Sequence, residues 1–269
     1  TPDHLKRHGN MEIYQAMKEK IFAQETSEDF LVLNYDDEKV RNMKSRANCK
    51  VFYFSRKKIL DEGAFVDENK LIIKFDGKTY EICKIDEIGI KGGHNVENAL
   101  AASMTAFLAG VTVENICKVL KNFKGVEHRI EFVREIDGVK YYNDSKATNT
   151  DSAIKALETF DKNINLIAGG DDKLTDLTEF LNLVNQRVDN LILIGDAAKR
   201  FKTDAIKNGF NAEKIFDAGY SMKNAIEIAK KISKSPQIVL LSPACASFDM
   251  YDNFEERGKD FKQIVMEMI

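Results

Sequence analysis

The second half of the chain alternates between short apolar runs and longer amphipathic stretches, and this pattern restricts the fold more than any other feature. The apolar runs INLIAGG, NLILIG and QIVLLSP occupy residues 164–170, 190–195 and 237–243. Apolar residues recur at helical spacing in residues 151–160, 177–186, 198–209, 222–232 and 253–268. Buried strands that alternate with helices are typical of a parallel sheet covered on both faces. We therefore predict an α/β fold whose C-terminal part is a Rossmann-like, doubly wound, mostly parallel sheet.

The first half of the chain has a mixed pattern of helices, strands and hairpins. The expected elements are a helix at 11–22, a strand at 30–34, a helix at 36–47, a strand at 50–54, hairpins between 64 and 85, and helices at 94–110 and 113–123. Gly125, Val126 and Glu127 then interrupt the pattern. We place a domain boundary there, which gives one domain at 1–126 and a second at 127–269.

The composition is that of a globular protein and argues against several classes of function. The 269 residues suffice for one large or two ordinary domains, and 43% of them are hydrophobic. A net charge of −3 argues against a protein that binds nucleic acid or an anionic membrane surface. No apolar run approaches the ~20 residues of a membrane-spanning helix, and the polar start of the sequence lacks the apolar core of a signal peptide. None of the four cysteines forms a C-x-x-C pair, so we expect a reduced, cytoplasmic protein.

Polar residues gather where three of the predicted strands end. These corners read NDSKATN, GGDDK and SPACASFDMYDNF, at residues 143–149, 169–173 and 242–254. In open parallel sheets, ligands bind beyond the carboxyl ends of the strands. We therefore expect the three corners to meet at one edge of the sheet.

This edge carries cations and hydroxyl groups that suit a small dianion. Lys146 and Lys173 supply positive charge at two corners, and the hydroxyls come from Thr148, Ser242 and Ser247. The helices that follow would add free backbone N–H groups and partial positive charge at their N-termini. A dicarboxylate fits this chemistry better than an apolar ligand does. The alternative is that the Ser, Thr and Asp residues only cap helices.

No nucleotide-binding loop is complete in this sequence. The segment DGKT at 76–79 resembles the end of a phosphate loop, but Ile72 occupies the position of the required first glycine, and a hairpin is expected there. No G-x-G-x-x-G opens a strand–helix unit, so dinucleotide binding has no support.

Seven ordered blocks of the sequence resemble the Mur ligase family. They read DHLKRHGNMEIYQAMKEKIF, LNYDDE, KGGHNVENALAA, GVEHRIEFV, YYNDSKATNTDSAIKAL, LIAGGDDK and LLSPACASFDMYDNFEERGKDF. The last three resemble those of the family member that adds D-glutamate. The resemblance implies part of a central ATP-binding domain at 1–126, followed by the whole amino-acid-binding domain at 127–269. In the family a UDP-binding domain and a G-T-N-G-K-T loop precede the first block, so we expect this chain to be a fragment without ligase activity of its own.

The reaction that this resemblance implies is ATP-dependent amide formation in peptidoglycan synthesis. ATP would phosphorylate the carboxylate of UDP-N-acetylmuramoyl-L-alanine, and the amine of D-glutamate would then displace phosphate. Transfer of phosphate to an anion requires charge neutralisation, which Mg²⁺ and lysines commonly supply. We expect a monomer that acts on small molecules, with neither a nucleic-acid partner nor insertion in a membrane.

The functional residues of the family match positions of this sequence in three groups. The catalytic and metal-binding group comprises His4, Lys18, which is carbamylated in the family, and Lys146. The ATP-binding group comprises Asn95, Asn98, Arg129 and Asp144. The D-glutamate-binding group comprises Lys146, Thr148, Lys173, Ser247, Phe248 and Phe254, with Asp171 expected to orient Lys173.

Two other interpretations stay open at this point. One is a folate ligase that adds glutamate, which the corner at 242–254 and the FEERG sequence that overlaps it disfavour. The other is a non-catalytic module that kept the amino-acid pocket for sensing or assembly.

Overall fold

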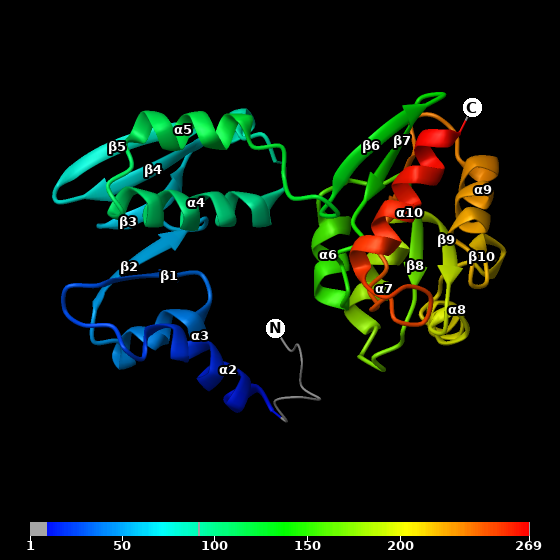
Figure 1. Cartoon of the computed structure of the whole chain (residues 1–269), viewed down its shortest axis with the longest axis horizontal. Coiled ribbons are helices and arrows are strands. Elements are labelled where there is room, and N and C mark those ends of the chain that lie inside the picture. Colours follow the sequence, from blue (N-terminus) through cyan, green and yellow to red (C-terminus); the bar gives the residue numbers. More distant parts are fainter. Residues whose placement is uncertain (1–9, 91, 269) are drawn as a thin grey trace. The chain divides into compact units, whose positions relative to one another are not determined.

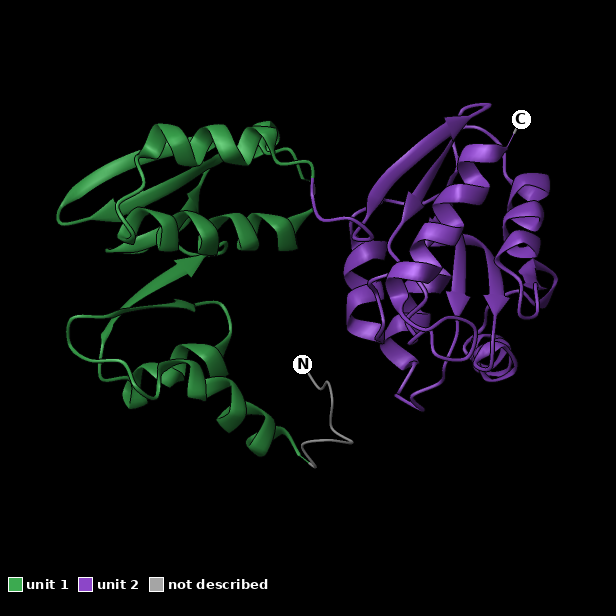
Figure 2. Ribbon diagram, viewed as in Figure 1, with its two compact units in different colours: residues 1–124 green, residues 125–269 purple. Residues whose placement is uncertain are grey.

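The computed structural model describes residues 10–90 and 92–268, and the chain forms two compact units (Figure 2). Unit 1 comprises residues 1–124 and unit 2 comprises residues 125–269. The division between Lys124 and Gly125 falls beside the glycine at which the sequence pattern is interrupted.

A five-stranded sheet forms the centre of unit 1. Its strands, in spatial order, are β1 (Phe30–Asn34), β2 (Lys50–Ser55), β3 (Gly63–Asp67), β4 (Lys70–Phe75) and β5 (Lys78–Lys84). The first three strands run parallel, whereas β3, β4 and β5 pair antiparallel through two tight turns, as the alternating pattern predicted. Glu68 and Asp76 each adopt a φ of 50° in these turns, and Gly77 follows at 70°.

Helices pack on both faces of this sheet. One face is covered by α4 (Gly93–Leu108) and α5 (Val113–Asn122), which bury Leu100, Met104 and Ile116 in a common core. On the other face, Phe22 and Met43 pack with β1. The expected helix at 11–22 is α2 (Met11–Glu19) extended by a 3₁₀ turn.

The prediction of one helix at 36–47 was wrong in its extent. The α-helix there is only α3 (Glu38–Arg41), and a 3₁₀ helix, Asn42–Arg46, continues it. The Ser45 hydroxyl donates a hydrogen bond to the Asn42 carbonyl over 2.9 Å. Such local side-chain bonds compete with regular helical geometry.

Unit 2 is built on a six-stranded sheet with the order β10-β9-β8-β11-β7-β6. Figure 1 labels β6 to β10 of this sheet. Its strands are β6 (Glu131–Ile136), β7 (Val139–Asn143), β8 (Ile164–Gly169), β9 (Val188–Ile194), β10 (Ile215–Asp217) and β11 (Ile238–Leu241). β6 and β7 form an antiparallel hairpin, and the other pairs of described strands are parallel. The predicted mostly parallel sheet is therefore confirmed.

Helices cover both faces of this second sheet, as predicted. The core on one face includes residues of α6 (Thr150–Glu158), α7 (Thr178–Arg187) and α8 (Ala198–Lys207). The core on the other face includes residues of α9 (Met222–Ile232) and α10 (Phe254–Glu267). The sequence did not predict β10, because three residues are too short to show a period. Among the described helices, none is both long and apolar enough to cross a membrane.

The sheet order brings the three polar corners of the sequence together. β11 pairs in parallel with β7 on one side and with β8 on the other. The carboxyl ends of these three strands are therefore neighbours, and the expectation of a shared edge is confirmed.

Candidate functional site

Asp144, in the corner after β7, has a carboxylate that is hydrogen-bonded to other residues of unit 2. Asp144 is buried; its Oδ1 accepts from the Ile130 amide over 3.2 Å and its Oδ2 from the Ser242 hydroxyl over 2.7 Å. Burial raises the pKa of the Asp144 carboxyl to about 7, although both hydrogen bonds oppose the rise. Asp144 thus links the start of unit 2 to the corner after β11.

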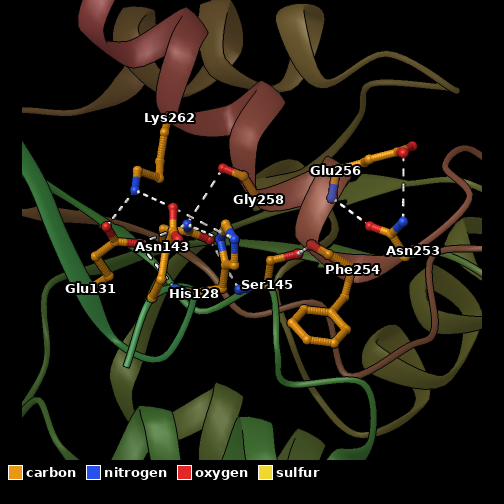
Figure 3. Close-up of polar contacts among 10 residues, drawn as sticks. His128, Glu131, Asn143, Ser145, Asn253, Phe254, Glu256, Gly258 and Lys262 are labelled. Carbon is orange, nitrogen blue, oxygen red and sulfur yellow. Dashed lines mark hydrogen bonds and ion pairs between the residues drawn. The ribbon is translucent and has the colours of Figure 1, made fainter. Parts of the chain in front are cut away.

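Lys146 and Phe254, both predicted to belong to the D-glutamate site, lie together. The Lys146 Nζ is 4.5 Å from the centroid of the Phe254 ring, a cation–π distance. The Lys146 amide donates to the His128 carbonyl over 3.0 Å. Phe254 is the first residue of α10, and the Asn253 side chain caps this helix by accepting from the Glu256 amide over 2.8 Å (Figure 3).

The remaining predicted D-glutamate contacts lie at the same edge but differ in exposure. Ser247 is buried, whereas Phe248 beside it is 72% exposed. Lys173 and Thr148 are partly buried. The Asp171 amide donates to the Ala246 carbonyl over 3.0 Å, which ties the corner after β8 to the corner after β11.

Arg257 belongs to this edge, and the sequence interpretation missed it. It is among the largest fully buried side chains, at 1% exposure. Burial lowers the pKa of its guanidinium to about 10. One signal was available: with Phe254, Phe261 and Val265, Arg257 follows the helical spacing of the inward face of α10.

A second polar group surrounds His128 (Figure 3). The Asn143 amide nitrogen lies 2.9 Å from the His128 Nδ1 and 3.2 Å from a Glu131 carboxylate oxygen. The Lys262 ammonium bonds Glu131 over 2.5 Å and Glu127 over 2.9 Å. This group connects α10 with the first residues of unit 2.

The same group includes three residues that could in principle bind a metal ion. Ligand atoms of Glu127, His128 and Glu131 lie within 4.8 Å of one another. However, the Lys262 ammonium already bonds both carboxylates. The Asn143 Oδ1 accepts from the Ser145 amide, so its NH₂ faces His128 Nδ1 and leaves the ring proton on Nε2. Burial lowers the pKa of His128, which favours this neutral form. We interpret the group as an ion-pair and hydrogen-bond network.

Arg129 is exposed and lies between two residues with left-handed backbone conformations. His128 has a φ of 65° and Ile130 a φ of 46°. A β-branched residue seldom adopts this conformation, and such strain persists only where the surroundings impose it. Here the buried His128 ring and the bond from the Ile130 amide to Asp144 hold the segment.

The predicted residues of unit 1 lie in two places. Asn95, in the first turn of α4, is buried, and its Oδ1 accepts from the exposed Asn98 over 3.3 Å. Lys18 is exposed on α2, with its Nζ 5.3 Å from the centroid of the Tyr14 ring. It borders an apolar hollow of about 370 Å³. His4 lies outside the described residues.

Two protein families match the chain in succession. The Mur ligase middle domain matches residues 1–106, and the Mur ligase glutamate ligase domain matches residues 128–245. The UDP-N-acetylmuramoylalanine--D-glutamate ligase of Thermoanaerobacter sp. (strain X514) is 48% identical over 268 residues, which are 100% of this chain and 59% of that protein. The chain thus spans less than two thirds of the length of this relative.

Solved structures of ligases share the fold. A pseudomurein peptide ligase type C from Methanothermus fervidus has a TM-score of 0.70 at 18% identity, with 99% of this chain and 61% of that chain covered. Folylpolyglutamate synthase from Mycobacterium tuberculosis, complexed with ADP and AMPPCP, has a TM-score of 0.67 at 16% identity, with coverages of 97% and 62%. Identities this low show the fold alone, so the fold does not separate a pseudomurein peptide ligase from a folylpolyglutamate synthase.

Proposed function

This chain belongs to the Mur ligase family, and from this premise we propose that it is part of an ATP-dependent ligase that joins D-glutamate to UDP-N-acetylmuramoyl-L-alanine. The observation that carries the proposal is the 48% identity, over the whole chain, to an enzyme named for that reaction. The match covers the whole chain and therefore spans the three corners at which ligands of parallel sheets bind. It favours a D-glutamate ligase over a folate ligase.

The proposed reaction has two steps. The γ-phosphoryl group of ATP passes to the carboxylate of the L-alanine arm, and ADP leaves. The amine of D-glutamate then attacks the carbonyl carbon of this acyl phosphate, phosphate departs with the C–O bonding pair, and the amine gives up a proton. Both steps concentrate negative charge, so cations fixed in place would stabilise their transition states.

Unit 2 would bind D-glutamate through its carboxyl edge. Lys146 and Lys173 would pair with the two carboxylates, and the Ser247 and Thr148 hydroxyls would donate to them. Phe248 and Phe254 would enclose the carbon chain. The Lys146 ammonium already lies 4.5 Å from the centroid of the Phe254 ring. Because this contact restricts the lysine side chain before D-glutamate binds, little conformational entropy is lost on binding.

Four residues would face the nucleotide. Asn95 and Asn98 would contact it from unit 1, and Arg129 would pair with its phosphates. We also propose that Asp144 binds the ribose; each of its oxygens already accepts one hydrogen bond and keeps a second acceptor site.

Magnesium would neutralise phosphate charge during the transfer. His4 and carbamylated Lys18 would be its protein ligands. The exposure of Lys18 fits this role, because its amine is open to reaction with CO₂. The folylpolyglutamate synthase that shares this fold was solved with ADP and AMPPCP, which supports ATP as the nucleotide. We further propose a cytoplasmic monomer.

A calorimetric titration tests the amino-acid site. We expect this chain to bind D-glutamate weakly and in preference to L-glutamate. Lys173→Ala should weaken binding about tenfold, because an ion pair to a carboxylate is lost. Lys234→Ala is the matched control, since Lys234 is an exposed lysine just before β11, at the opposite end of the sheet. Equal heats for both enantiomers, or no effect of Lys173→Ala, would contradict the proposal.

A further inference from the structure

We propose that Arg257 is a positioning residue that locks the three polar corners of unit 2 into one binding rim. Its guanidinium contacts two of the corners directly and the third through a shared carbonyl. We call Arg257 and the hydrogen bonds of its guanidinium to these corners the clamp. The role of the clamp in ligand binding rests on the proposed function, whereas its role in holding the corners together does not.

The hydrogen bonds of the guanidinium define this clamp. Toward the corner after β7, Nε donates to the Ser145 hydroxyl over 3.0 Å and Nη2 to the Ser145 carbonyl over 2.8 Å. Toward the corner after β11, Nη1 donates to the Ala246 carbonyl over 3.0 Å and Nη2 to the Cys245 carbonyl over 3.1 Å. One side chain from α10 therefore joins segments that lie about a hundred residues apart.

The corner after β8 is tied to the same clamp. The Ala246 carbonyl accepts from Arg257 and also from the Asp171 amide over 3.0 Å. Gly170 makes this approach possible: a Cβ there would lie 2.4 Å from the Ala246 carbonyl oxygen and 3.1 Å from Arg257 Nη1. With a φ of 132°, Gly170 also has a backbone conformation that other residues rarely adopt.

Each contact of the clamp lies within two residues of a proposed D-glutamate contact. Ser145 precedes Lys146, Ala246 precedes Ser247, and Asp171 is two residues before Lys173. A shift of any corner would therefore displace a group that must meet a carboxylate.

The chemistry requires a guanidinium at this position. In the described chain its hydrogen bonds go to carbonyl and hydroxyl oxygens, with no carboxylate among the acceptors. Its planar fork reaches four acceptors in two directions, which a lysine ammonium cannot do from a single atom. The buried positive charge also lies behind the rim that is proposed to bind a dianion, and it would attract this ligand electrostatically.

The test separates geometry from charge. Arg257→Lys keeps the positive charge but loses the fork, and Arg257→Met removes both. Arg187→Lys is the matched control, because Arg187 also donates to backbone carbonyls, those of Leu157 and Phe160, away from the three corners. Each variant is examined for cooperative unfolding, hydrogen exchange and D-glutamate affinity.

If the clamp positions the rim, Arg257→Lys will speed amide exchange about tenfold in peptides covering 144–148 and 169–173, since bonds that hold these corners are lost. D-glutamate affinity will fall about tenfold, and the control will change neither quantity. If Arg257→Lys does not fold, Ser145→Ala removes the Nε acceptor together with the 2.8 Å bond from the Ser145 hydroxyl to the Phe254 carbonyl, and leaves the other three bonds of the guanidinium in place. It should show the same effects at smaller size.

Unchanged exchange and unchanged affinity in a folded Arg257→Lys protein would overturn the proposal. Binding that survives in Arg257→Lys but not in Arg257→Met would also overturn it, because charge alone would then suffice. Should the unsubstituted chain not bind D-glutamate while exchange still accelerates in the variant, the clamp stands and the proposed function fails.

Discussion

At the scale of single residues, Asp144 combines burial with a pKa near neutrality. Burial raises the pKa of its carboxyl to about 7 from an ordinary value of 3.8. Between these two values the folded protein holds a proton that the unfolded chain has released. Stability contributed by this group therefore falls as pH rises through that window. The positive charges of Arg129 and Arg257 work against this trend by lowering the pKa.

We predict that Asp144→Asn flattens this pH dependence. The amide keeps an acceptor for the Ile130 amide and gains a donor toward Ser242, so the fold should survive. The change in unfolding free energy between pH 5 and 7 should be smaller by about 2 kcal/mol than in the unsubstituted chain. Urea denaturation at both pH values measures it. Asp161→Asn, at an exposed position, is the control, and equal slopes for all three proteins would rule the explanation out.

At the scale of elements, α10 organises the edge of unit 2 through its inner face. Gly258 lies in the interior of this helix, and its carbonyl accepts a hydrogen bond from the side-chain amide of Asn143 over 3.4 Å. A Cβ on Gly258 would lie 2.2 Å from the His128 Nδ1. The absence of a side chain at Gly258 therefore lets the buried His128 ring pack directly against the backbone of the helix.

Gly258→Ala should destabilise the protein, contrary to ordinary helix propensity. In an open helix this change would stabilise by about 1 kcal/mol, but here overpacking should cost about 1–3 kcal/mol. Chemical denaturation of the single variants and of the double variant Gly258→Ala/His128→Ala measures the coupling. We expect the cost of the alanine to shrink by about 1 kcal/mol or more once the ring is gone. Additive effects would show that His128 is not the obstacle.

The elements and their meeting at one edge could be predicted from the sequence, whereas the clamp could not. Apolar periodicity identifies buried strands such as β8 and β11, and parallel pairing then fixes where their ends meet. Periodicity carries no information on β10, which is too short, or on the partners of a side chain. The bonds of Arg257 to Ser145 span 112 residues, and no local pattern encodes them.

At the scale of the whole molecule, the chain contains two units but no phosphate loop. No G-x-x-x-x-G-K-[ST] sequence occurs in its 269 residues, although the proposed reaction begins with phosphoryl transfer. The match to the Thermoanaerobacter ligase covers 59% of that protein.

We therefore predict that this polypeptide by itself releases no phosphate from ATP in the presence of UDP-N-acetylmuramoyl-L-alanine and D-glutamate. A colorimetric phosphate assay measures this, with the full-length Thermoanaerobacter ligase as the positive control. Turnover above the background without D-glutamate would mean that the chain neutralises the phosphates by some other means.

The Ala246 carbonyl accepts two donors, one from Arg257 and one from the Asp171 amide. Both acceptor sites of this oxygen are occupied by donors of the protein itself, so a ligand cannot form a hydrogen bond to it. The atoms that hold the three corners in place are then different from the atoms that select the ligand. Lys173 and the exposed Phe248 could be exchanged to accept an amino acid of another charge or size while the scaffold beneath them stays intact, which makes this domain a candidate for redesigned selectivity.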